Sequence, residues 1–432
     1  MPAAVSYLPI RAAYRAGKVP AARSALSVMV VQRQTPGSFP NWPMRAALAS
    51  CLAAGLIMLA SAAQARIIQV GPQEGIKTIA AAAQLARDDD VVEIASGDYE
   101  GDVAVWLQKR LTIRGVGQRP VLSAAGNSAE GKAIWVIRNG DFYVSNIEFR
   151  GARVADGNGA GIRFERGKLK IAHCVFLDNQ MGILTAGFKD AELTIEGSVF
   201  AQAPKQDRPL PHLLYVGGIN LLRVFGSRFH GGYQGHLLKS RARVSDIRYS
   251  LLVDGEGGSA SYEAEFPNGG DVTLIGNVIG QSSTTRNPII VAYGAEGSTW
   301  PLNRLRMVHN TLYSEGWRPA WFLHVFKDKI DAPLEIMTRN NLLVGSGLFT
   351  TNLTGQHQGN YFAPAVVLGD TAIMDFTLGA DSWLRGLVDP IAPDPEGLQP
   401  KFEQLMPGRI SAIGEPSKWA PGAMQATTLR KP

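Results

Sequence analysis

The chain has 432 residues, of which 45% are hydrophobic and 19% are charged, so it holds enough apolar side chains for a large core. Its formal charge of +6 comes entirely from residues 1–65, where six of the 43 basic residues lie and no Asp or Glu occurs. The rest of the chain therefore carries 37 basic and 37 acidic residues. A neutral body exerts no general attraction on polyanions, and we expect no nucleic-acid partner.

Residues 1–65 are typical of a leader that is removed on export. From Met44 the sequence runs through one Arg and an apolar stretch to Ala63-Gln64-Ala65, the pattern of a signal peptide with its cleavage site before Arg66. Residues 1–43 contain Pro and Arg but no acid. We interpret them as the product of a start codon assigned too early, with a genuine long leader as the alternative. We therefore expect a periplasmic or extracellular protein without a transmembrane segment in the mature chain.

Two cysteines bear on this interpretation. Leu48-Ala49-Ser50-Cys51 resembles a lipoprotein box, but almost no hydrophobic stretch separates it from Met44. Removal of the leader leaves Cys174 alone, so the mature chain cannot form an intrachain disulfide and must be held by its core. Cys174 has hydrophobic neighbours, and we expect it to be a small buried residue.

The mature chain opens with a short strand, a helix and a second strand. Ile67–Val70 is the first strand, and apolar residues at 76, 79, 80, 83 and 86 predict an amphipathic helix over 75–87. Val91–Ile94 is the next strand, and Gly97-Asp98-Tyr99 turns out of it. Because the helix precedes the repeat described next, we expect it to cap an open apolar end.

A six-residue phrase then recurs and determines the fold class. Most copies have an apolar residue, two variable residues, a Ser or Asn or another small residue, a variable residue and a hydrophobic one: Val144–Phe149, Ile171–Phe176, Ile195–Phe200, Val224–Phe229, Ile247–Leu252, Leu274–Ile279, Met307–Leu312 and Met337–Leu342. Intervals of about 23–33 residues leave no room for long helices between the strands. Each unit is one coil that can bury its apolar residues only by stacking on its neighbours. The sequence therefore predicts an all-β, right-handed parallel β-helix of about nine or ten coils over residues 66–350.

The polar residue at the fourth place is expected to be structural. If the coils stack in register, these residues form an internal hydrogen-bonded ladder at a turn, comprising Ser198, Ser227, Ser250, Asn277 and Asn310. Residues 351–432 lose the repeat and are rich in Pro, with one helical candidate at 374–387. We expect this irregular tail to pack along the solenoid and cover its C-terminal end.

The segment from Ile76 to Tyr99, together with the coil phrases, resembles the pectate-lyase-like right-handed β-helix superfamily over about Arg66 to Gly347. The resemblance implies this fold and a polysaccharide ligand, because β-helix enzymes of the superfamily hold acidic sugars on a long outer face. It transfers no catalytic motif. Clustered Asp residues on consecutive strands, the Asp-Asp and Gly-His pattern of polygalacturonases and the Asp-Pro-His-Asp motif of mannuronan epimerases are all absent. The sequence partly resembles β-helix alginate lyases that use a Lys and an Arg from adjacent strands, and Lys239 and Arg241 are the matching residues.

Two coils carry a candidate site. His212-Leu213-Leu214-Tyr215 and His236-Leu237-Leu238-Lys239 lie one coil apart in the sequence, so His212 should stack on His236 and Tyr215 on Lys239. Strand alternation sends Lys239 and Arg241 to one outer face. Glu263 and Glu265 are the expected neighbours in the following coil.

These residue types suit β-elimination from a uronate. The reaction needs the sugar carboxylate neutralised, a base for the C5 proton and an acid for the leaving oxygen. We expect Lys239 as base with a lowered pKa, Arg241 as charge neutraliser and Tyr215 as acid, with His236 and His230 as rival bases. Residues expected to contact the substrate are His212, His230, Arg243, Glu263, Glu265 and Asn268.

Each of these residues also has a simpler interpretation. Lys239 and Arg241 can form a solvated salt-bridge face with Glu263 and Glu265. His212 and His236 can form an internal ladder like that of Ser and Asn, and Tyr215 can stack on sugar rings without taking part in chemistry.

No motif indicates a bound group. The Gly-rich stretch 157–161 leads into a strand and not into a helix, so it is not a phosphate cradle, and we expect no cofactor and no metal. The sequence favours a lyase or related epimerase on an acidic glycan. The alternatives are a non-catalytic carbohydrate-binding or envelope β-helix, and a glycoside hydrolase with Glu263 and Glu265 about 6.6 Å apart on one strand face.

Overall fold

The computed structural model describes residues 65–206, 210–349, 355–405 and 409–428. The expected signal peptide, its start at Met44 and Cys51 lie outside the described residues. The compact unit that begins at Ala65 is considered by itself below.

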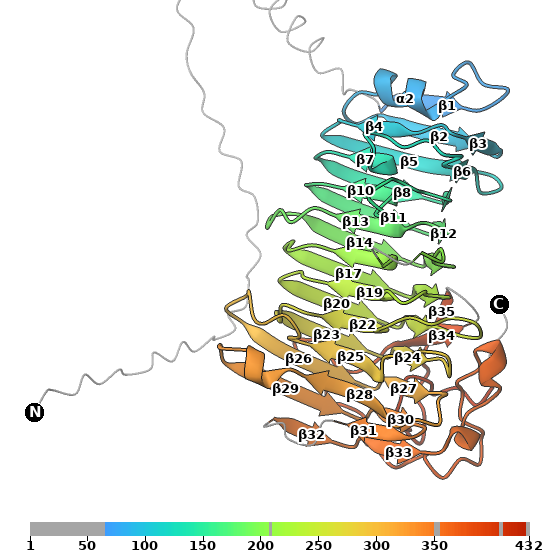
Figure 1. Ribbon diagram of the computed structural model, residues 1–432. Helices are drawn as coiled ribbons and strands as arrows, with labels where there is room; N and C mark the ends of the chain where they lie inside the picture. Colours follow the sequence, from blue (N-terminus) through green and yellow to red (C-terminus); the bar gives the residue numbers. More distant parts are fainter. Residues whose placement is uncertain (1–64, 207–209, 350–354, 406–408, 429–432) are drawn as a thin grey trace, which may run out of the picture. The chain divides into compact units, whose positions relative to one another are not determined.

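The described chain is a parallel β-helix whose strands form three long sheets, here called A, B and C (Figure 1). Sheet A has 12 strands: β1 (Ile67–Val70), β2 (Val91–Ala95), β5 (Arg110–Val116), β8 (Asp141–Ser145), β11 (Lys168–Ala172), β14 (Glu192–Glu196), β17 (Leu221–Phe225), β20 (Val244–Arg248), β23 (Asp271–Ile275), β26 (Asn303–Val308), β29 (Leu334–Arg339) and β32 (Gln356–Gln358). Sheet B has 11: β3 (Asp98–Glu100), β6 (Val121–Ser123), β9 (Glu148–Arg150), β12 (Val175–Leu177), β15 (Val199–Ala201), β18 (Arg228–His230), β21 (Leu251–Val253), β24 (Val278–Gln281), β27 (Thr311–Ser314), β30 (Leu342–Val344) and β33 (Tyr361–Ala363). Sheet C has 10: β4 (Ala104–Trp106), β7 (Ala133–Ile137), β10 (Ala160–Phe164), β13 (Met181–Thr185), β16 (His212–Val216), β19 (Leu238–Ser240), β22 (Ala264–Phe266), β25 (Ile289–Tyr293), β28 (Ala320–Val325) and β31 (Gly347–Phe349). The predicted fold class is confirmed, with about ten coils.

The recurring phrase spans the tight turn from sheet A to sheet B. In Ile195–Phe200, for example, β14 ends at Glu196, Gly197 has a φ of 51°, Ser198 is fully buried and β15 begins at Val199. Here a left-handed residue directly precedes the ladder residue, as it does in most of the other phrases. This geometry explains why the fourth place of the phrase holds small or amide side chains.

The ladder itself is confirmed and longer than predicted. Each backbone N–H donates to the side-chain oxygen one coil further on, from Cys174 through Ser198, Ser227, Ser250, Asn277, Asn310 and Asn341 to Asn360. In the last phrase Asn341 and not Asn340 is the ladder residue, because Asn340 occupies the left-handed position with a φ of 57°. Cys174 is buried at the start of the ladder, and burial raises the pKa of its thiol to about 12.

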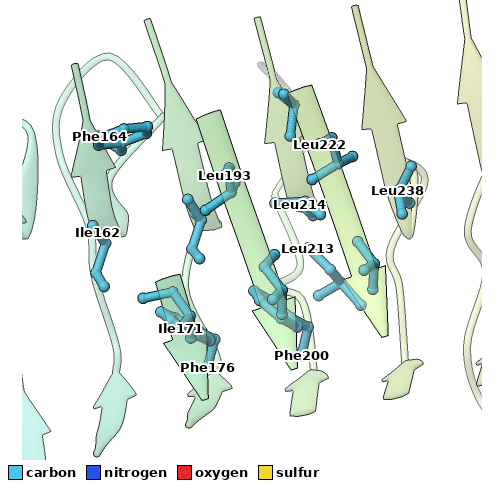
Figure 2. Packing of buried hydrophobic residues seen from close by; sticks show 14 of the residues in the cluster. Ile162, Phe164, Ile171, Phe176, Leu193, Phe200, Leu213, Leu214, Leu222 and Leu238 are labelled. Atoms are coloured by element: carbon cyan, nitrogen blue, oxygen red, sulfur yellow. The ribbon is translucent and has the colours of Figure 1, made fainter. Parts of the chain in front are cut away.

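Between the sheets the core is a stack of coil-by-coil columns. Figure 2 shows Ile162, Phe164, Phe176, Phe200 and neighbouring apolar side chains filling the space inside the coils. The rings of Phe149, Phe176, Phe200 and Phe229 lie nearly parallel, with successive centroids 5.1, 4.5 and 4.7 Å apart. Because the register is the same from coil to coil, side chains of the same kind stack on one another.

The N-terminal end is closed by a helix shorter than predicted. The one α-helix of the described residues is α2 (Ile79–Leu85), which packs beside β1 and β4. Thr78 caps it by accepting from Ala81 N, and the Asp102 carboxylate accepts from the first two helical N–H groups at 2.6 and 2.9 Å. Because these acceptors hold the helix N-terminus at Ile79, residues 75–77 lie outside the helix.

The C-terminal tail runs along the last coils. Its elements are the 3-10 turns η2 (Ala365–Val367) and η3 (Thr371–Ile373) and the antiparallel pair β34 (Phe402–Leu405) and β35 (Arg409–Ala412). Outside the tail, a further 3-10 turn, η1 (Lys327–Lys329), lies between β28 and β29. Phe376, Leu378 and Leu384 are buried against the outer side of sheet B. The predicted helix over 374–387 is wrong. Because the buried residues lie at spacings of two and six, they dock an irregular segment and not a helical face.

Candidate functional site

Sheet C carries a column of polar side chains on its outer face. Tyr215 of β16 pairs in register with Lys239 of β19, and Lys239 pairs with Glu265 of β22. The neighbouring Leu214 and Leu238 are fully buried and face the core. The expected stacking of Tyr215 on Lys239 is therefore found.

Arg241, just after β19, is held by four hydrogen bonds. Its Nε donates to Tyr215 Oη at 3.0 Å, and its Nη1 donates to Asn268 Oδ1. The Glu296 carboxylate accepts from both terminal nitrogens, at 2.6 and 2.9 Å. This two-point contact is the strongest geometry available to a guanidinium and a carboxylate. Burial opposes the charge of Arg241, but Glu296 and Tyr215 outweigh it and raise its pKa.

Lys239 lies between two carboxylates. Its Nζ is 2.8 Å from Glu265 Oε2 and 3.1 Å from Glu296 Oε1. Burial would lower the pKa of Lys239, but the two carboxylates outweigh it and raise the pKa above its ordinary value. Arg241 donates to Glu296 and, with Lys239, lowers the pKa of this carboxyl to about 2.

These contacts correct two expectations. Lys239 does not point into solvent, because it is only 8% exposed, and it does not have the lowered pKa that a lysine base needs. Both cations are ion-paired, as the salt-bridge alternative expected, although their partners are Glu265 and Glu296 and not Glu263.

The two histidines form a ladder beside this column. His236 N donates to His212 Nδ1 at 2.9 Å, and Tyr262 N donates to His236 Nδ1 at 3.3 Å. Because each Nδ1 accepts a backbone N–H, the neutral rings carry their hydrogen on Nε2. The Nε2 of His236 lies 3.1 Å from Glu265 Oε2. Burial lowers the pKa of both rings, and for His236 Glu265 offsets part of this effect. With Nδ1 engaged and Nε2 protonated, neither histidine has a free lone pair to act as a base.

The structure separates Glu263 from this site. Its side chain is fully buried, and its backbone bonds to Leu238 and Ile290 in the neighbouring coils. The prediction that it shares a face with Glu265 is wrong because β22 begins only at Ala264, so strand alternation does not reach back to Glu263. The hydrolase pair Glu263 and Glu265 is therefore excluded.

Two further candidates lie elsewhere. His230 belongs to β18 of sheet B, where burial lowers the pKa of its ring to about 4. Arg243 lies at the turn before β20 of sheet A and donates to Asn220 Oδ1. The side-chain contacts of the described residues join neither of them to the polar column, so both predictions of substrate contact lose their geometric basis.

The sequence reasoning missed Glu296, which comes from the turn between β25 and β26. A signal was present in the repeat, because the interval from Asn277 to Asn310 is the longest of the series. The extra residues form a long turn, with Gly294 and Gly297 at φ of 78° and 88°, and Glu296 N donates to Pro267 O at 2.8 Å. This turn carries the carboxylate back over two coils to Arg241. We call Tyr215, Lys239, Arg241, Glu265, Asn268 and Glu296 the sheet C cluster.

Three comparisons place the chain among known proteins. No family model matches the chain, and no curated protein matches it. Among solved structures, the crystal structure of pectate lyase Pel9A matches with a TM-score of 0.57 and 14% sequence identity, over 83% of this chain and 96% of that chain. At this identity the likeness concerns the fold alone. The resemblance to the pectate-lyase-like β-helix is thus confirmed for the architecture.

Two negative findings concern the described residues. Among them no group of three or more His, Cys, Asp or Glu side chains is arranged to hold a metal ion. No helix in the described part of the chain is long and apolar enough to cross a membrane.

Proposed function

We propose that the protein is exported and acts on an acidic polysaccharide as a lyase or a related epimerase, with the sheet C cluster as its site. The observation that carries the proposal is the position of the Glu296 carboxylate. Arg241 and Lys239 hold it in a two-cation cradle directly beside the Tyr215 hydroxyl. A uronate carboxylate has the same charge and the same pair of oxygens, so it can replace Glu296 there.

Elimination from a uronate would use this cradle as follows. Arg241 and Lys239 neutralise the substrate carboxylate and so stabilise the negative charge that develops when the C5 proton leaves. Tyr215 is the group placed for proton transfer. Its Oη accepts a hydrogen bond from Arg241 Nε, so a cationic donor already faces the phenolic oxygen. The role of base, which the sequence assigned to Lys239, passes to Tyr215 as its phenolate, which takes the C5 proton and gives the same proton to the leaving oxygen while the C4–O bond breaks and the C4–C5 double bond forms.

A glycoside hydrolase is less well supported, although one geometric relation favours it. Glu265 Oε2 and Glu296 Oε1 lie 2.8 and 3.1 Å from the same atom, Lys239 Nζ, so the sum of these two distances is an upper limit on their separation. That limit permits, without fixing, the spacing of about 5–5.5 Å between the two carboxyl groups of retaining hydrolases, one of which must be protonated. The pKa of Glu265 is lowered because His236 and Lys239 outweigh its burial, and Arg241 and Lys239 lower that of Glu296, so neither carboxyl is a suitable acid.

The proposal is tested on a panel of uronate polymers. The wild-type protein should produce unsaturated ends, detected by ultraviolet absorbance, on at least one of polygalacturonate, polymannuronate, polyguluronate or polyglucuronate. Tyr215→Phe and Arg241→Gln should each lower the rate at least about 100-fold, because each removes a group that acts in the transition state. Matched controls are Tyr143→Phe and Arg114→Gln on the outer face of sheet A, which should leave the rate unchanged.

Other outcomes identify the alternatives. New reducing ends without absorbance would replace the lyase by a hydrolase. Binding of these polymers without cleavage and without a change in the C5 configuration of the uronates, measured by NMR, would leave the non-catalytic carbohydrate-binding protein. Full activity of both site variants on a polymer that the wild type cleaves would refute the sheet C cluster as the site.

A further inference from the structure

A cavity of about 310 Å³ lies outside the sheet C cluster, at the turn from sheet B to sheet C. The loop between β24 and β25 and the residues before β28 line it: Gln281, Ser282, Ser283, Thr284, Thr285, Arg286, Asn287, Pro288, Gly316, Trp317 and Arg318. Its size is at the lower end of the range of small-ligand sites, about 300–1,000 Å³. The cavity is therefore large enough to hold one sugar unit.

Two arginines give the cavity a positive charge. Arg286 and Arg318 are exposed, and in the described part of the chain neither forms an ion pair. Glu315 lies on the same stretch, but its carboxylate accepts from Ser283 N at 3.0 Å and forms no ion pair with either arginine. By contrast, most arginines on the outer face of sheet A have carboxylate partners, for example Arg114 with Glu93. The two guanidinium groups thus have no ion-pair partner among the described residues, although the Glu315 carboxylate lies at the edge of the same cavity.

A buried amide provides an independent observation. Gln281 is only 4% exposed, and its Nε2 donates to Ser314 Oγ at 3.1 Å. Its Oε1 is buried and has no donor among the described residues. An unpaired buried acceptor is costly, by about 1–3 kcal/mol, so such a group is normally satisfied by a ligand or by water. Gln281 lines the cavity, but its Oε1 lies beneath the surface, so a hydroxyl group placed there donates to it only when the exposed loop side chains around it shift.

An aromatic ring completes the site. Trp317 is 83% exposed, and the Arg318 guanidinium lies 5.3 Å from its ring centroid. An exposed tryptophan at a cavity mouth offers a flat apolar surface. Such a surface matches the C–H face of a pyranose ring.

We propose that this cavity is a second binding site for one acidic sugar unit of the polysaccharide. Arg286 and Arg318 bind its carboxylate, Gln281 Oε1 accepts from a ring hydroxyl, and Trp317 packs against the ring. The choice of an acidic sugar rests on the proposed function, whereas the site itself rests on these four side chains.

The cavity is connected to the sheet C cluster along the surface. Thr284, Arg286 and Asn287 also line a second cavity of about 480 Å³, together with Tyr233 and Ser261. Asn287 Nδ2 donates to Ser261 Oγ at 2.9 Å, and the next residue, Tyr262, places its ring 4.8 Å from that of His236. One extended polysaccharide chain can therefore reach from the cavity beside Trp317 to the stacked histidines beside Glu265.

The test measures binding without turnover. In a Tyr215→Phe background, tetragalacturonate, tetramannuronate and tetraglucuronate are titrated calorimetrically, with cellotetraose as the neutral comparator. The double variant Arg286→Gln/Arg318→Gln should weaken binding of the preferred uronate at least tenfold, and Gln281→Leu should weaken it several-fold. Trp317→Phe should abolish the change in tryptophan fluorescence that binding causes. The matched control Arg114→Gln/Lys170→Gln removes the same charge from sheet A and should bind like its parent.

The outcomes are separable from those of the proposed function. Binding that survives the double variant, or that the control weakens equally, overturns the second site. Binding of cellotetraose as tight as that of the uronates, or no binding of any uronate, overturns the acidic ligand. If the wild type cleaves no uronate polymer but the double variant still loses binding, the lyase proposal fails and the second site stands.

Discussion

At the scale of single residues, Glu263 shows how one coil position can differ from its neighbours. Leu237, Glu263 and Ile290 occupy equivalent places in consecutive coils, because they directly precede Leu238, Ala264 and Val291, which pair in register. All three are fully buried. Both carboxyl oxygens of Glu263 are without a partner among the described residues. Burial raises the pKa of Glu263 well above its ordinary value, and nearby Asp254 adds repulsion. An apolar column thus contains one carboxyl that is stable only when protonated.

Replacing this residue should stabilise the protein. Glu263→Leu matches the column and should raise the free energy of unfolding by about 1–3 kcal/mol at neutral pH, because it removes an unpaired buried polar group. Since the folded-state pKa is raised, the ionisation penalty is absent below the ordinary pKa of 4.5 and grows as pH rises from there to the folded-state value. The gain should therefore shrink in acid, as measured by urea unfolding from pH 4 to pH 8.

A second variant isolates the ionisation. Glu263→Gln keeps the shape and cannot ionise, so its stability relative to the wild type should also increase with pH. Asp254, whose pKa burial raises to about 6, is present in all three proteins, but its repulsion with Glu263 is lost in both variants and contributes to the same pH dependence. A gain for Glu263→Leu that does not change with pH would contradict the buried ionisable carboxyl.

At the scale of elements, the ladder explains why the fold could be predicted and the site only in part. The turn from sheet A to sheet B repeats in nearly every coil and needs the same two residue types each time, so the phrase is visible in the sequence. The stacking of His212 on His236 followed from the same periodicity. Glu296 did not, because it comes from a long turn whose path no repeat defines. Lys239 lies in the predicted register with Tyr215, but its burial beside Glu296 was not predicted.

The asparagine part of the ladder should be more important for stability than exposed asparagines. Asn310 Nδ2 donates to Leu274 O and Asn341 Oδ1, and its Oδ1 accepts from Asn277 N. Asn310→Ala leaves buried groups unpaired and should cost about 2–4 kcal/mol in thermal or urea unfolding. Asn310→Ser keeps one acceptor, as in the earlier coils, and should cost less, about 1–2 kcal/mol. Exposed Asn139→Ala is the control and should change stability by no more than about 0.5 kcal/mol. Equal losses for the Ala and Ser variants would show that the ladder oxygen is dispensable.

At the scale of the whole described unit, a solenoid is stabilised coil by coil, since each coil contacts only its neighbours. The C-terminal tail is an exception, because it contacts several coils at once. Its buried residues pack on the outer side of sheet B along β21, β24, β27 and β30, and form a second core with Leu251, Val278, Tyr313 and Leu342. The C-terminal coils therefore have an apolar core on both sides of sheet B, whereas in the described part of the chain this second core does not extend to the N-terminal coils.

Loosening the tail should therefore destabilise one end of the solenoid and not the other. Phe376 is 2% exposed and meets Tyr313 edge to face, with ring centroids 5.5 Å apart. Phe376→Ala removes this contact and should cost about 3–5 kcal/mol locally. Hydrogen-exchange mass spectrometry should then show faster exchange in β24, β27, β30 and β33, with protection unchanged in β5, β8 and β11, because stability in such a stack is set by neighbouring coils. Val366→Ala, at a position 85% exposed on the same tail, is the control and should leave exchange as in the wild type. Equal loss of protection in β5 and β30 would mean that the coils unfold as one cooperative unit, and the tail would then stabilise the entire solenoid.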